Sequence, residues 1–157
     1  MTRKIVRVVY QLSLSAALTI VSVSASAGMI AFSGDAGEKL WIQDAPKLGT
    51  DAAIMKFEGI ESDWQGKLLK VEKSNHSNGV RYHFDYKRGS KTLSYVPVVE
   101  TGKTMIAGTI TRRIELYIPK HKDPIVLKHD LDLTKSSQST DLVGDFAKSP
   151  FTPNMKD

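Results

Sequence analysis

Apolar and polar residues alternate with a period of two through the second half of the chain. Between residues 80 and 87, Val80, Tyr82, Phe84 and Tyr86 fall on one side, and charged or polar residues fall on the other. This alternation is typical of a half-buried antiparallel strand. It recurs in two further segments, and weaker patterns predict additional strands. The strands expected are 53–58, 67–73, 80–87, 93–99, 105–111, 113–118, 125–133 and 141–147.

Turn-forming residues separate these segments. Asn78 and Gly79 form an Asn-Gly pair, which tolerates positive φ and closes tight hairpins. Single glycines at 89 and 102 predict two further turns, and prolines bracket the loop 119–124. Short connections leave no room for crossover helices. The pattern therefore predicts an all-β fold, a single antiparallel meander of about eight strands closed as a small lipocalin-like barrel, with a β-sandwich as the alternative.

Two segments of the expected domain lack a clear period. Residues 28–52 are rich in Gly, Asp, Ala and Pro, with Leu40, Trp41 and Ile42 as one apolar island. We expect this segment to be partly irregular, with its apolar island forming either an extra strand or a stretch that lies across one end of the barrel. The last residues, 148–157, contain two prolines and are expected to form an irregular tail. Residues 28–157 have the size of one ordinary domain.

The amino-terminal segment has the features of a secretory signal peptide. Arg3, Lys4 and Arg7 precede a mostly apolar run over residues 8–23, and Ala25, Ser26 and Ala27 end it with small residues. A charged start, an apolar run and a small-residue cleavage site define such signals. We predict cleavage after Ala27, with a bacterial periplasmic or secreted location. No transmembrane segment is expected after cleavage.

Net charge and cysteine content narrow the function classes. The chain has 22 basic and 17 acidic residues, and the three basic residues of 1–27 leave a balance of +2 for residues 28–157. Nucleic-acid binding needs a concentrated basic footprint, which this balance argues against. The chain contains no cysteine, which removes disulfides and thiol chemistry and favours a bacterial source.

The first candidate site is a ligand pocket inside the barrel. His129 alternates with apolar residues and is expected to face the interior, where burial would shift its pKa. Tyr82, Tyr86 and Tyr95 are expected on neighbouring strands. On inner faces these tyrosines would suit a partly apolar ligand. The alternative is that all four are ordinary core residues.

The second candidate site is the loop that carries Lys120, His121 and Lys122, which we expect to contact another envelope or secreted protein. A third possibility is a metal at His83 and Asp85, which share one face of a strand. Nucleophile-elbow and phosphate-loop motifs are missing from the sequence. We therefore predict no catalytic residues, metal or cofactor.

One short motif resembles part of a known architecture. Trp64, Gln65 and Gly66 stand at the start of an expected strand, followed by Lys67 and Leu68. Lipocalin-like and avidin-like barrels also begin with a glycine and a tryptophan on the first strand, although here the order is Trp-x-Gly. The resemblance concerns architecture and carries no function.

Three functions follow from these features. The favoured one is a non-enzymatic protein-binding module of the inhibitor, immunity or envelope-assembly type. The second is a lipocalin-like carrier of a small, partly apolar ligand. The third is a metal-dependent envelope hydrolase.

Overall fold

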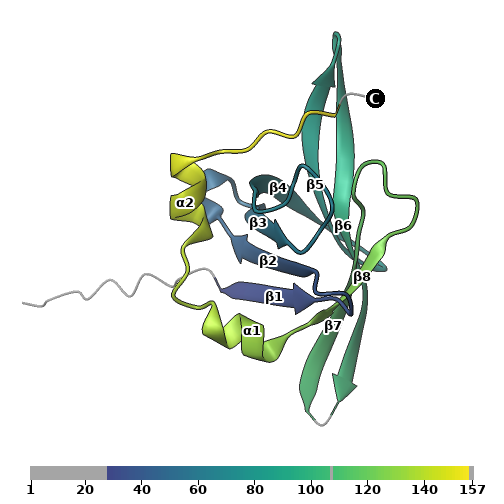
Figure 1. Cartoon of the computed structure of the whole chain (residues 1–157), viewed down its shortest axis with the longest axis vertical. Helices are drawn as coiled ribbons and strands as arrows, with labels where there is room; N and C mark the ends of the chain where they lie inside the picture. The colour runs from purple at the N-terminus through teal and green to yellow at the C-terminus, as the bar shows by residue number, and fades with distance from the viewer. Residues whose placement is uncertain (1–27, 107, 156–157) are drawn as a thin grey trace, which may run out of the picture.

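The computed structural model describes residues 28–106 and 108–155, and these residues form a closed antiparallel β-barrel. The strands follow one another around the barrel in chain order, which confirms the barrel over the sandwich. Short helices follow the last strand and lie against one side of the barrel (Figure 1). The strands are β1 (Met29–Ser33), β2 (Lys39–Asp44), β3 (Ala52–Glu58), β4 (Leu68–His76), β5 (Gly79–Arg88), β6 (Lys91–Ile106), β7 (Thr109–Leu116) and β8 (Ile125–His129). The helices are η1 (Pro46–Leu48), α1 (Leu131–Ser136) and α2 (Leu142–Lys148).

The turn expected around Asn78 is present as a two-residue hairpin between β4 and β5. His76 pairs with Gly79 across it. Gly79 has φ +135°, and a Cβ atom there would lie 2.2 Å from the carbonyl oxygen of Glu100. Only glycine can bring β5 this close to β6.

Strand β6 differs from the expectation. The turn expected at Gly102 and the separate strand at 105–111 are wrong, because β6 continues to Ile106 and β7 begins at Thr109. The register between β6 and β7 shifts at Thr101, where β6 holds one extra residue. The glycine thus accompanies a β-bulge rather than a turn. The long ribbon of β5, β6 and β7 extends beyond the barrel in both directions (Figure 1).

The interior of the barrel is filled by apolar side chains. Phe32, Leu40, Phe57 and Leu127 have no exposed surface, and Trp64 is 3% exposed. The aromatic stripe expected on β5 points inward as its alternation predicts. This interior cluster is the main source of hydrophobic stabilisation.

A second apolar cluster lies outside the barrel, between β1–β3 and the helices. Ala31, Trp41 and Ile54 point away from the interior and pack with Leu142 of α2. Strands β1–β3 are therefore buried on both faces, and their sequences lack polar alternation for this reason. Within the segment 28–52, the apolar island around Trp41 is a strand, β2, and residues 29–33 form a further strand, β1, that the sequence pattern did not indicate.

Two segments expected to be strands are wholly or partly helical: 125–133 changes from strand to helix after His129, and 141–147 is almost entirely helix. Strand β8 ends at His129, and the Asp130 side chain accepts a hydrogen bond from the Leu133 backbone N–H, which caps α1. This hydrogen bond is the main cause of the lowered pKa of Asp130. Residues 141–147 form most of α2, with the Asp141 side chain accepting from Gly144. Capping chemistry overrides the apparent period-two pattern at both places.

The signal-peptide prediction, with its cleavage after Ala27, lies outside the described residues. Neither α1 nor α2, nor any other helix in the described ranges, has the length and hydrophobicity needed to cross a lipid bilayer.

Trp41→Phe tests how the helices are held on the barrel. The Trp41 indole N–H donates a buried 2.9 Å hydrogen bond to the Ser137 hydroxyl at the end of α1. We expect Trp41→Phe to lower the free energy of unfolding by about 1–2 kcal/mol, measured by urea denaturation. Ser137→Ala should cost a similar amount, and the double variant should cost less than the sum. Strictly additive losses would contradict this account.

Candidate functional site

Aromatic side chains close the end of the barrel at which β3 ends and β4 begins. Trp64, from the loop between these strands, packs edge-on against Phe84 at 6.0 Å and Tyr95 at 5.9 Å between ring centroids. Phe57 lies 5.5 Å away on its other side. Burial raises the pKa of Tyr95, and the neighbouring Tyr86 contributes to the shift. Two of the expected ligand-binding residues, Tyr86 and Tyr95, thus belong to one cluster.

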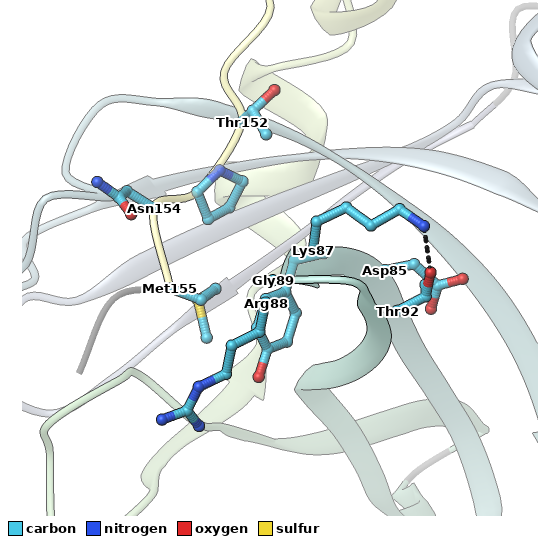
Figure 2. A pocket seen from close by; sticks show the side chains of 10 residues that line it. Asp85, Lys87, Arg88, Gly89, Thr92, Thr152, Asn154 and Met155 are labelled. Atoms are coloured by element: carbon cyan, nitrogen blue, oxygen red, sulfur yellow. Dashed lines mark hydrogen bonds between the residues drawn. The ribbon is translucent and has the colours of Figure 1, made fainter.

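A cleft lies beside this cluster, between the β5–β6 hairpin and the C-terminal segment. Its volume is about 590 Å³, and Tyr86 is part of its lining. Figure 2 shows Thr152, Asn154 and Met155 facing Lys87 and other hairpin residues across the cleft. The Lys87 ammonium donates a hydrogen bond to the Thr92 hydroxyl. The cleft therefore offers an aromatic ring, an ammonium and hydroxyl groups to a bound molecule.

The other two expected ligand-binding residues lie elsewhere. Tyr82 is 4% exposed and is packed within the barrel core. His129 ends β8, with its ring 5.8 Å from the ring of Phe32 and its Nε2 atom 3.3 Å from the Thr134 hydroxyl. Among the described residues, neither Tyr82 nor His129 lines the cleft near Tyr86.

A buried ion pair lies toward the opposite end of the barrel. Glu100 on β6 is 1% exposed, and its Oε2 atom accepts hydrogen bonds from Nε and Nη2 of Arg112 on β7, the first at 3.2 Å. The Lys103 ammonium lies 3.5 Å from Oε1, which has no hydrogen-bond partner among the described residues. Arg112 also lies over the Phe32 ring. One buried carboxylate thus faces two cationic groups, the Arg112 guanidinium and the ammonium of the largely exposed Lys103.

Protonation at this pair follows from its surroundings. Burial alone would lower the pKa of Arg112, but its hydrogen bond with Glu100 and the charge of that carboxylate outweigh burial, and the pKa is raised. Burial raises the pKa of Tyr82, against the opposing effect of Arg112. The guanidinium therefore stays charged and the phenol stays neutral at ordinary pH.

The expected partner-binding residues lie on an exposed loop between β7 and β8. Lys120, His121 and Lys122 are all exposed. The His121 ring contacts the carbonyl oxygen of Glu61 at 3.0 Å, which ties this loop to the loop that carries Trp64. Lys120 has φ +72°, an uncommon conformation for a residue with a side chain. Its side chain is held on the surface of the loop.

The metal hypothesis at His83 and Asp85 finds little geometric support. The nearest further carboxylate, on Glu72 of β4, lies 4.0 Å from the His83 ring. No group of three or more His, Asp or Glu side chains within the described ranges is arranged to hold a metal ion.

Sequence reasoning missed the buried ion pair. A signal for Arg112 was present, because it continues the inward series of Ile114 and Leu116 at the same spacing of two. Glu100 follows an unbroken run, Val96 to Val99, with no alternation that would reveal its orientation. Its burial is decided by the bulges in β6.

The fold and these residues define a small antiparallel β-barrel with a filled interior, an aromatic end and a buried ion pair in its wall. Comparisons with protein-family models, with curated proteins and with solved structures give no significant match.

Glu100→Gln tests the role of the ion pair. The substitution keeps the shape of the side chain and leaves the Arg112 guanidinium without a buried counter-charge. We expect a loss of about 3 kcal/mol in the free energy of unfolding, measured by urea denaturation of residues 28–157. Glu100→Leu combined with Arg112→Met should recover most of this loss, since no buried charge remains. Equal stability of Glu100→Gln and the unmodified protein would show that the pair contributes nothing to the fold.

Proposed function

We propose that the protein is an exported, non-enzymatic binding module that holds an acidic partner polypeptide on the half of the barrel formed by β5–β8. Export is inferred from the signal-like residues 1–27. The observation that carries the binding proposal is the uneven distribution of charge along the chain.

Charge is concentrated on one half of the barrel. Residues 79–129, which include β5–β8, contain ten basic and four acidic residues, a balance of +6. Residues 28–78 and residues 130–157 each carry a balance of −2. The net charge of +2 for residues 28–157 is therefore the sum of a strongly positive region and two slightly negative regions. Such asymmetry steers a partner of opposite charge and orients it.

The outward face of β7 and β8 combines this charge with exposed apolar groups. Arg113 and Lys128 are directly opposed across the two strands, and neither forms an ion pair within the described ranges. Like charges in this arrangement repel one another and destabilise a sheet. Tyr117 and Val126, on the same hairpin, are each 37% exposed. Interfaces favour this mixture of arginine, tyrosine and apolar surface.

The loop with Lys120, His121 and Lys122 continues this hairpin and carries two lysines and one exposed carboxylate, on Asp123. The one carboxylate among the outward residues of β7, on Glu115, accepts a 2.6 Å hydrogen bond from the Tyr117 hydroxyl. Because the Glu115 carboxylate is hydrogen-bonded to Tyr117, Arg113 and Lys128 can pair with carboxylates of a partner. The Lys120–Lys122 loop and the outward face of β7–β8 therefore support one continuous binding surface.

A charge-reversed variant tests the proposal. We expect Arg113→Glu with Lys128→Glu to weaken partner binding by at least about tenfold, because attraction becomes repulsion on the proposed surface. Native mass spectrometry of the protein purified gently from the source envelope fraction would identify the bound polypeptide, and titration would then measure its affinity. Binding should also weaken as salt is raised from 0.1 to 0.5 M.

Lys47→Glu with Lys135→Glu is the matched control. Both lysines are exposed and lie outside residues 79–129, and the change in net charge is the same. The control should bind the partner as the unmodified protein does. Equal binding by all three proteins would contradict the proposal, and so would a partner retained at high salt.

A further inference from the structure

The barrel wall has an opening between β4 and β5. Residues 68–72 of β4 pair with β3, whereas residues 72–76 pair with β5. Residues 84–88 of β5 pair only with β6. In the described ranges, residues 68–71 of β4 and 84–88 of β5 therefore face each other without pairing in a β-ladder. These two edges are called the β4–β5 opening.

The C-terminal segment 149–155 lies in this opening. The chain leaves α2 and runs across the barrel to the β5–β6 ribbon (Figure 1). Phe151 forms a single parallel bridge with Leu69 of β4. Burial alternates along the segment, with Phe151 and Met155 packed against the interior cluster, Pro153 buried, and Thr152 and Asn154 exposed. The segment therefore contributes side chains to the core as a strand would.

As a strand, however, the segment is incomplete. Pro150 and Pro153 have no N–H group and cannot donate to a ladder. Space remains in the opening. One cavity of about 190 Å³ lies between Lys70–Glu72 and His83–Asp85, and the cleft of about 590 Å³ separates the segment from the β5–β6 hairpin. The β4-facing backbone edge of residues 84–87 thus lies next to open space rather than next to another strand.

We propose that the β4–β5 opening is a strand-addition site for an extended segment of a partner polypeptide, and that residues 149–155 occupy it when the partner is absent. The partner segment has apolar residues at alternate positions, which enter the places of Phe151, Pro153 and Met155. Its backbone N–H and C=O groups take over the bridge at Leu69 and pair with the edge of residues 84–87, which the proline-containing segment does not reach. This site is separate from the charged face of β7 and β8 and does not depend on its function.

The first test uses synthetic peptides as probes of the opening. One peptide has the sequence of residues 149–157, and the second has valine at the position of Pro153, which restores a backbone donor. Phe151→Ser with Met155→Ser in the intact chain removes the two apolar anchors of the internal segment. We expect the valine peptide to bind this variant at least about tenfold more tightly than the unmodified protein, where the tethered segment competes.

Thr152→Ala with Asn154→Ala is the matched control, because both side chains are exposed in the same segment. This control should bind the peptide as weakly as the unmodified protein does. Hydrogen exchange should slow at residues 84–88 when the valine peptide binds. Equal peptide affinity in all three proteins, or unchanged exchange at 84–88, would overturn the proposal.

A second variant covers the case in which loss of Phe151 and Met155 unfolds the protein. Pro153→Val in the intact chain keeps an apolar side chain and adds a donor to the internal segment. We expect slower exchange at residues 84–88 and weaker binding of the valine peptide than in the unmodified protein. Unchanged exchange and unchanged peptide binding would overturn the proposal.

Light scattering with size-exclusion chromatography separates a partner from a second copy. We expect the unmodified protein to remain a monomer at high concentration. A concentration-dependent dimer that Phe151→Ser with Met155→Ser abolishes would mean that two copies exchange their C-terminal segments. That result would overturn the assignment of the site to a different polypeptide.

Discussion

Closure of the barrel between β1 and β8 is the constraint on which the rest of the structure depends. Only two residue pairs join these strands. Asp130 reinforces this short junction, since its backbone N–H donates to Ala31 and its side chain accepts from the Ser33 hydroxyl and the Leu133 N–H. The same residue ends β8 and starts α1. Helix α1 therefore covers the outer surface of β1 because β8, which directly precedes the helix, pairs with β1.

The barrel wall is thus weak at two places, and each is covered by a segment that follows β8. Helix α1 lies against β1, where the first and last strands meet. Residues 149–155 lie between β4 and β5, where Phe151 bridges to Leu69, Phe151 and Met155 pack against the interior cluster, and Pro153 is buried. The first cover is capped and hydrogen-bonded, whereas the second contains two prolines and leaves open space. We therefore place the replaceable segment at β4–β5 and not at β1–β8.

The strands that are buried on both faces and the strands that carry excess positive charge lie in different halves of the barrel. Strands β1–β3 are buried on both faces by the interior and the helices, and they lie in a region with a slight negative balance. Strands β5–β8 have one face open to solvent and carry most of the excess positive charge. A surface covered by the protein's own helices has no room for a partner. The open strands supply the exposed surface, and their charge defines which partners suit it.

Prediction from sequence succeeded where one face of a strand is buried and the other is solvated. Residues 80–87 show this, because Tyr82 and Phe84 are buried as their alternation requires. It left two alternatives open where both faces are buried, as at Trp41, since the polar half of the pattern is then missing. It failed at residues 131–133, where leucines at alternate positions continue a strand pattern beyond a helix cap, and at residues 141–147, which form most of α2. Of the candidate ligand residues, Tyr86 and Tyr95 share one cluster, whereas Tyr82 and His129 lie apart from the cleft.

The sequence by itself determined the all-β class, the hairpin at Gly79 and the exposure of the Lys120–Lys122 loop, because period-two burial and turn chemistry are local properties. Tertiary structure alone decided that Glu100 and Arg112 meet inside the wall and that residues 149–155 lie between β4 and β5. Both depend on strand register and on bulges, which arise from pairing between distant segments. A shift of one residue turns a side chain to the other face of a sheet, and local patterns in a single strand do not contain that information.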